Sequence, residues 1–140
     1  MSRHLIVGLD PGVKTGFAIW SSTERRLVDV ATMSITATMR RVQAMQDAGS
    51  LHSVVFEDAR LRTGYFGVNA SAKQQGAGSI KRDCSIWQEF LEGLTGVPFK
   101  PVSPKSKGAK VDAALFVRLT GYTCRTSEHG RDAAMLVVGI

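Results

Sequence analysis

Two carboxylates end apolar stretches of the sequence, at places where a negative charge is costly. Asp10 follows the apolar residues 6–9, and Glu57 closes the apolar residues 54–56. Each stretch is typical of a buried strand, where an uncompensated charge is expensive. If the two strands are parallel neighbours, Asp10 and Glu57 meet at the carboxyl edge of a sheet, where open α/β sheets place their sites. Asp58 alternates to the opposite face and is the poorer candidate.

A second pair of candidate ligands lies near the end of the chain. His129 and Asp132 are three residues apart at the start of the last expected helix, so their side chains share a face. Carboxylates at adjacent strand ends, as expected for Asp10 and Glu57, can lie about 4 Å apart, where they repel by about 4 kcal/mol at an effective dielectric constant of about 20. A shared proton or a cation removes that repulsion, and oxygen ligands of this kind suit Mg²⁺.

Each of these residues also has a simpler interpretation. Asp10 stands before Pro-Gly, where Asp commonly forms a turn. His129 and Asp132 fit the first turn of a helix, where polar side chains cap it and Asp suits the helix dipole. The joint placement of the residues at the ends of different elements favours the metal site over these separate roles.

The balance of charge points to a polyanionic partner. There are 18 Lys and Arg against 12 Asp and Glu, which gives a net charge of +6 and favours nucleic acid. Many small proteins are basic for solubility alone, so the position of the charges matters more. The Gly-rich segment 59–79 has no periodicity and is expected to form a long loop, of the kind that is usually either functional or disordered. Its basic residues Arg60, Arg62 and Lys73 are candidate DNA contacts.

Length and composition predict a single domain that spans residues 1–140. No apolar run approaches the roughly 20 residues of a membrane span, and the sequence MSRHLIVGLD lacks a signal-peptide pattern. Cys84 and Cys124 are too few for a disulfide framework, which fits a reducing compartment. We therefore expect a cytoplasmic location, in a host cell if the chain is phage-encoded, with an organelle left open.

Hydrophobic periodicity predicts an α/β fold. The expected strands cover residues 5–9, 16–22, 26–35, 53–58 and 97–102. The expected helices cover residues 36–49, 80–94 and 111–121 and a last helix that begins at Ser127. Short connections make the first three strands antiparallel, and intervening helices make the later strands parallel. The result is a mixed five-stranded sheet flanked by helices.

Three segments carry a resemblance to a known family. GLDPGVKTGFAIW, VVFED and SEHGRDAAMLVVG resemble, in order and spacing, the RuvC-like Holliday junction resolvases of the ribonuclease H superfamily. The match runs over nearly the whole chain, and GLDPG followed by TG is its strongest motif. The resemblance implies a ribonuclease H-like fold. It also implies a homodimeric endonuclease, dependent on Mg²⁺ or Mn²⁺, that nicks two like strands of a four-way DNA junction.

The resemblance also implies roles for particular residues. The family's catalytic carboxylates correspond to Asp10, Glu57 and Asp132, and His129 falls where many members have Asp and others have His. Two metal ions about 3.5–4 Å apart would activate a water and stabilise the leaving 3′ oxygen. Asp10 would bridge both ions, Glu57 and Asp132 would each hold one, and His129 would ligate a metal or orient the water.

Further expectations concern DNA and the partner subunit. The family's phosphate-contacting lysines fall in the basic loop 103–110, where Lys110 is the best match and Lys105 and Lys107 follow. Lys110 would neutralise charge that develops on the phosphate. The helix at residues 80–94, with Trp87 and Phe90, is the expected dimer interface. A tryptophan that faced solvent would expose a large apolar surface, and such side chains are enriched at interfaces.

The middle of the chain departs from the family pattern. Members commonly begin the second helix with a GQARG-like sequence, whereas this chain has QGAGSIKRD. Tyr65 and Phe66 are candidates for the aromatic wedge that members push into the junction centre. An aromatic pair that packs back on its own domain is an equal alternative.

Three other functions fit parts of the pattern. Another ribonuclease H-like nuclease, acting on RNA or on other branched DNA, would share the same site. An actin-like ATPase or sugar kinase shares the opening G-[IL]-D-x-G, but it needs two such domains and an adenosine site, which 140 residues cannot hold. A non-catalytic protein that binds DNA structures would have no need of Asp10, Glu57 and Asp132.

Overall fold

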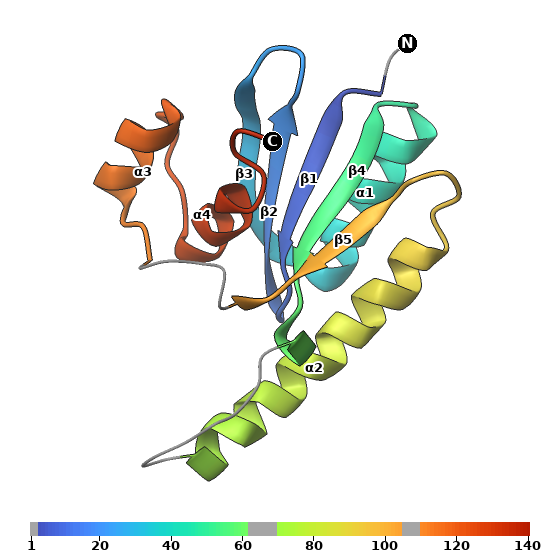
Figure 1. Cartoon of the computed structure of the whole chain (residues 1–140), viewed down its shortest axis with the longest axis vertical. Coiled ribbons are helices and arrows are strands. Elements are labelled where there is room, and N and C mark those ends of the chain that lie inside the picture. The colour runs from blue at the N-terminus through green and yellow to red at the C-terminus, as the bar shows by residue number, and fades with distance from the viewer. Residues whose placement is uncertain (1–2, 62–69, 105–109) are drawn as a thin grey trace.

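The computed structural model describes residues 3–61, 70–104 and 110–140, with the backbone alone for residues 70–77. A five-stranded mixed sheet lies between helices (Figure 1). The strands are β1 (Leu5–Asp10), β2 (Lys14–Ser21), β3 (Arg26–Ser34), β4 (Leu51–Glu57) and β5 (Phe99–Val102). The helices are α1 (Ile35–Asp47), the 3₁₀ helix η1 (Ala59–Leu61), α2 (Ala70–Glu92), α3 (Ala113–Thr120) and α4 (Glu128–Met135).

The order of the strands in the sheet is β3-β2-β1-β4-β5. β1, β2 and β3 pair antiparallel, whereas β4 runs parallel to both β1 and β5. This topology confirms the predicted mixed sheet. It places the carboxyl ends of β1 and β4 beside each other in the middle of the sheet.

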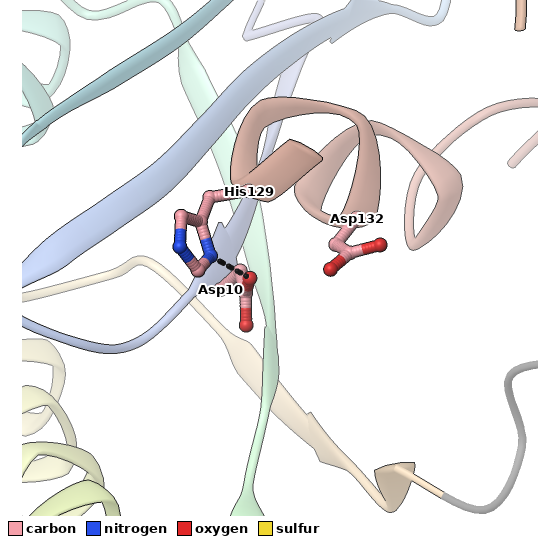
Figure 2. A group of neighbouring side chains, drawn as sticks. All are labelled: Asp10, His129 and Asp132. Carbon is pink, nitrogen blue, oxygen red and sulfur yellow. Dashed lines mark hydrogen bonds and ion pairs between the residues drawn. The ribbon is translucent and has the colours of Figure 1, made fainter. Parts of the chain in front are cut away.

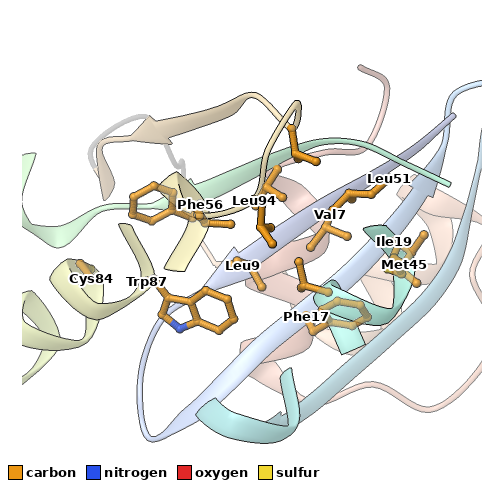
Figure 3. Close-up of a cluster of buried hydrophobic side chains, with 14 residues drawn as sticks. Val7, Leu9, Phe17, Ile19, Met45, Leu51, Phe56, Cys84, Trp87 and Leu94 are labelled. Carbon is orange, nitrogen blue, oxygen red and sulfur yellow. The ribbon is translucent and has the colours of Figure 1, made fainter. Parts of the chain in front are cut away.

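The two faces of the sheet have separate hydrophobic cores. α1 and α2 cover one face, where the odd-numbered residues of β1 and β2, such as Leu9 and Phe17, are fully buried (Figure 3). α3 and α4 cover the other face, where Ala18 and Val55 meet Ala133 of α4. Because side chains alternate along a strand, each residue of β1 is assigned to one of the two layers.

Polar side chains fix the ends of the helices on the α4 side. Ser127 is the N-cap of α4, as predicted, and its hydroxyl accepts a hydrogen bond of 3.2 Å from the backbone N–H of Gly130. Asp112 caps α3 in the same way, through the N–H of Leu115. Gly121 ends α3 with a φ of 73°, which glycine adopts without strain. These caps set where α4 begins, and therefore where its first turn lies.

The start of α2 differs from the prediction. Residues 70–79 are helical, so the expected loop at residues 59–79 is wrong over that part, and η1 occupies residues 59–61. Ala, Gln and Lys dominate residues 70–77, and their helix propensity outweighs two glycines that each cost about 1 kcal/mol. Figure 1 shows α2 as a long helix that extends beyond the sheet. No helix in the described ranges has the length and apolarity to cross a membrane.

The expectation that Trp87 forms a dimer interface is also wrong. Trp87 is fully buried and points into the core under α1 and α2, where it packs edge-on against Phe90 (Figure 3). The outward-facing apolar residues of α2 are instead Ile80 and Ile86, which are 42% and 41% exposed. Periodicity correctly predicted an apolar stripe on this helix. The stripe contains Trp87 and packs against the sheet of the same chain, not against a partner subunit.

Candidate active site

The carboxyl ends of β1 and β4 bring the first two predicted site residues to one edge. Leu9 of β1 pairs with Phe56 of β4, so Asp10 and Glu57 follow side by side at the strand ends. Leu9 and Phe56 point into the core under α1 and α2. Since side chains alternate, Asp10 and Glu57 point to the opposite face of the sheet, on which α4 packs.

α4 adds two further ligands to this edge. Asp10, His129 and Asp132 each offer a ligand atom, and these atoms all lie within 4.8 Å of one another (Figure 2). Nδ1 of His129 lies 3.2 Å from Oδ2 of Asp10. The carboxylates of Asp10 and Asp132 are 15% and 13% exposed, whereas the imidazole is 50% exposed. The group is therefore recessed on its acidic side and open on the histidine side.

Glu57 does not belong to this group of three among the described residues. It stands next to the group on the same face, at the end of β4, and its backbone pairs with Val102 of β5. The structure therefore brings three of the four predicted ligands together and leaves the fourth at the adjacent strand end.

Glycines allow α4 to approach the sheet closely enough to form the group. A Cβ atom on Gly16 would lie 1.9 Å from the carbonyl oxygen of His129, and one on Gly8 would lie 2.2 Å from that of Ala133. Gly130 in α4 faces the sheet, and a Cβ atom on Gly130 would lie 2.8 Å from Cγ1 of Val30 in β3. Helix and sheet thus touch backbone to backbone. Sequence reasoning did not assign this role, although the glycines of GLDPGVKTG were its signal.

A basic side chain borders the group. Nζ of Lys110 lies 3.5 Å from Oδ2 of Asp132 and forms an ion pair with Glu128. The hydrogen bond with Glu128 raises the pKa of Lys110, with a smaller effect from Asp132, and it lowers the pKa of Glu128. Lys110 is 68% exposed, so it remains accessible to a ligand. Glu128 was missed in the sequence, where its position beside His129 was the available signal.

Most of the other predicted DNA contacts cannot be placed. Arg62, Tyr65 and Phe66, and the lysines Lys105 and Lys107, lie outside the described residues. Lys73 lies in α2, where the structure describes only the backbone. Their contacts with DNA stay predictions.

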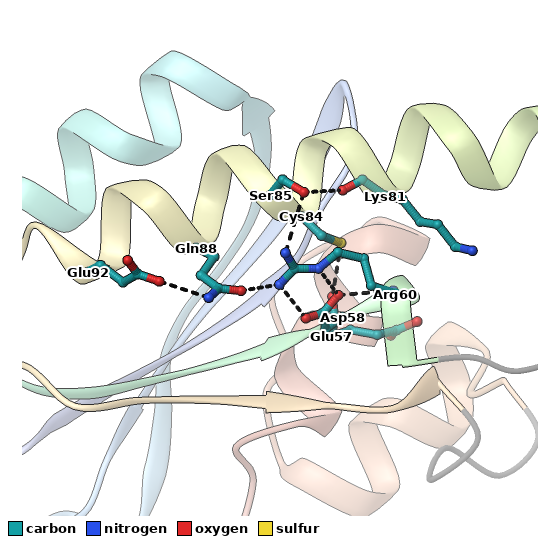
Figure 4. Close-up of polar contacts among 8 residues, drawn as sticks. All are labelled: Glu57, Asp58, Arg60, Lys81, Cys84, Ser85, Gln88 and Glu92. Carbon is teal, nitrogen blue, oxygen red and sulfur yellow. Dashed lines mark hydrogen bonds and ion pairs between the residues drawn. The ribbon is translucent and has the colours of Figure 1, made fainter.

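Arg60 is engaged within the chain itself. Its guanidinium holds the carboxylate of Asp58 with two hydrogen bonds, Nε to Oδ1 at 2.8 Å and Nη2 to Oδ2 at 2.7 Å (Figure 4). Burial raises the pKa of Asp58, but hydrogen bonds from the Arg60 side chain and backbone outweigh it and leave this pKa lowered. The pair is therefore charged at neutral pH, and Arg60 has an intramolecular partner that its predicted DNA contact would have to replace.

Comparison with known proteins addresses the fold. No family model and no curated protein matches the sequence. Among solved structures, the chain is similar to T. thermophilus RuvC in complex with a Holliday junction substrate, with a TM-score of 0.59 and 17% sequence identity. The match covers 96% of this chain and 90% of that chain.

The chain has the RuvC fold. A second structure of Thermus thermophilus RuvC matches with a TM-score of 0.54 and 15% identity, over 96% of this chain and 91% of that chain. The likeness confirms the predicted ribonuclease H-like sheet, in which three antiparallel strands are followed by parallel ones.

The donor set fits a hard divalent cation. Two recessed carboxylates and one imidazole converge, and the carboxylate of Glu57 lies at the next strand end. Carboxylate oxygens suit Mg²⁺ and Mn²⁺. A neutral imidazole is a common metal ligand in proteins. Among the described residues, neither Cys84, which is buried under the opposite face of the sheet, nor the exposed Cys124 belongs to the group.

Proposed function

We propose that this protein is an endonuclease that uses Mg²⁺ or Mn²⁺ to nick four-way DNA junctions at two like strands. The convergence of Asp10, His129 and Asp132 at the carboxyl edge of the sheet carries the proposal. It is supported by the RuvC fold, because the similar T. thermophilus RuvC was solved with a Holliday junction substrate. The net charge of +6 suits a DNA partner. In this proposal residues 1–140 act as one domain.

The proposed chemistry divides among the residues at the edge. Divalent ions supply Lewis acidity at the scissile phosphate and lower the pKa of the attacking water. Asp10 contributes the central charge from a rigid strand, and Glu57 and Asp132 contribute one carboxylate each. His129 either acts as a ligand or orients the water. The exposed ammonium of Lys110 meets the charge that develops on the phosphate.

The same site on the same fold also suits a nuclease for RNA or for other branched DNA. The discriminating experiment is a cleavage assay on a synthetic four-way junction beside duplex DNA, a flap and an RNA–DNA hybrid. We expect paired nicks in the junction and at least about tenfold slower cleavage of the other three. Preferred cleavage of the hybrid or the flap would move the proposal to that substrate. No cleavage of any of them would leave a binding protein.

Cleavage is expected to depend on the metal. Activity should require Mg²⁺ or Mn²⁺ and fall by at least about 100-fold in excess chelator. Ca²⁺ is larger and takes looser geometry, so it should support junction binding without cleavage. Rates of nicking, measured beside binding to the same labelled junction, separate these two effects. Undiminished cleavage in chelator would exclude the metal mechanism.

The proposed protein is a two-fold dimer, because a junction has two equivalent strands to cut. With Trp87 in the core, the outward face of α2 around Ile80 and Ile86 becomes the candidate interface. We expect the wild type to sediment as a dimer at micromolar concentration and Ile86→Asp to sediment as a folded monomer. Leu119→Asp, on the equally exposed surface of α3, is the control and should remain dimeric. A monomeric wild type would contradict the dimer.

A further inference from the structure

An ion pair directly beside Glu57 is held far more tightly than a surface contact. The Asp58 side chain is 3% exposed, and the Arg60 side chain is 31% exposed. Besides the two side-chain hydrogen bonds, the backbone N–H of Arg60 donates to Oδ1 of Asp58 at 3.0 Å. The guanidinium and the carboxylate thus meet as two parallel forks, the arrangement in which an arginine–carboxylate pair is strongest and most directional.

The same arginine reaches across to α2. Its Nη1 lies 3.4 Å from Oγ of Ser85, and its Nη2 donates to Oε1 of Gln88 (Figure 4). Gln88 in turn donates to Glu92 at 2.8 Å. The ion pair therefore joins the turn after β4 to one side of α2 over two helical turns.

Two further contacts fix the backbone around Glu57. The thiol of Cys84 in α2 donates to the carbonyl oxygen of Glu57 at 3.7 Å, and burial raises the pKa of this thiol to about 11, so it stays protonated. On the other side, the backbone N–H of Asp58 donates to the carbonyl oxygen of Val102 in β5 at 2.8 Å. The backbone at the end of β4 is consequently held from α2 and from β5.

We propose that the Asp58–Arg60 pair is a latch that fastens the end of β4 to α2 and so positions the Glu57 carboxylate beside the metal ligands. Glu57 and Asp58 point to opposite faces of the sheet. The Glu57 carboxylate lies on the site face, and the next residue, Asp58, anchors the strand end on the other face. Arg60 is then a positioning residue and not a DNA contact. The inference rests on the proposed function, since Glu57 matters only if the site binds metal.

The test compares Arg60→Gln and Arg60→Lys with Arg26→Gln. Arg26 is an exposed arginine at the start of β3, away from the site, and its loss changes the net charge equally. Arg60→Gln should lower kcat for junction cleavage about 10- to 100-fold, the usual effect of losing a group that orients a ligand. Junction affinity in Ca²⁺ should stay within about twofold of that of Arg26→Gln. Arg60→Lys, which keeps the charge without the fork, should fall between the two.

A second pair of measurements does not require cleavage. In Arg60→Gln, amide hydrogen exchange should accelerate at least about tenfold at residues 58–61 and in the facing part of α2, with Mn²⁺ binding weakened by a similar factor. If exchange and Mn²⁺ affinity match those of Arg26→Gln, the latch is wrong. Loss of junction affinity at unchanged kcat would likewise overturn it and make Arg60 a DNA contact. If the wild type cuts no junction while exchange and Mn²⁺ affinity change as expected, the proposed function fails and the latch stands.

Discussion

Asp10→Asn is expected to reduce junction cleavage by about 10³-fold or more while leaving the protein folded and bound to the junction. The amide keeps the shape of the side chain and its contact with His129, but it removes the charge at the centre of the ligand group. Removing one preorganised electrostatic group costs about 10²- to 10³-fold in kcat in other enzymes, and a carboxylate at the centre of the ligand group should reach the top of that range. Removing a negative charge from the edge at which we propose that DNA binds should leave junction affinity unchanged or slightly higher.

Nicking rates and junction affinity in Ca²⁺ are the measurements for Asp10→Asn, with thermal unfolding as a check on the fold. The wild type should unfold at a higher temperature when Mg²⁺ or Mn²⁺ is added, because a ligand of the native state stabilises it, and the variant should lose that shift. Asp47→Asn, on the exposed end of α1, is the matched control and should cut as the wild type does. If Asp10→Asn lost junction binding and folding together, Asp10 would be structural and the metal proposal would fail at its centre.

The sequence was sufficient to predict which edge of the sheet holds the candidate residues Asp10 and Glu57. Asp10 and Glu57 each end an apolar stretch long enough for a strand, and the helix between those strands makes them parallel. Parallel neighbours have their carboxyl ends at one edge, so the placement of the two carboxylates at adjacent strand ends follows from topology. The helical spacing of His129 and Asp132 then requires only that the last helix pack on that face. Each step depends on local patterns, which a single sequence carries.

Other features depend on contacts between distant parts of the chain. The apolar stripe of α2 contains Trp87. The local sequence pattern does not determine whether a sheet or a second subunit covers this stripe. The glycines in residues 76–78 argued for a loop, yet the fold continues α2 through them. Arg60 was placed among the DNA contacts because it is a basic residue of the Gly-rich segment 59–79, which was expected to be a loop. Its pair with Asp58 is local, but its hydrogen bond to Gln88 requires α2 to pack beside η1.

The close approach of α4 to the sheet is the least local of these features, and it leads to a prediction for Gly16. Gly16→Ala should lower both stability and cleavage strongly. The new Cβ would lie 1.9 Å from the carbonyl oxygen of His129, 2.5 Å from its carbonyl carbon and 3.0 Å from Cβ of Asp10. Neither the helix backbone nor the sheet backbone can give way without moving the other. Forcing extra atoms into packed interiors costs about 1–3 kcal/mol, and here the displaced groups carry the ligands.

Chemical denaturation and junction nicking under saturating Mg²⁺ give the two readouts for Gly16→Ala. A shift of about 1 Å in reacting groups is enough to cost about 100-fold in rate, so cleavage should fall by at least that factor even where the variant is folded. Gly12→Ala is the matched control in the same segment. Its Cβ would meet only the carbonyl oxygen of Lys14 at 3.5 Å, an ordinary contact, so it should fold and cut like the wild type. If the two alanine variants behaved alike, α4 would not rest on Gly16, and the position of His129 beside Asp10 would need another cause.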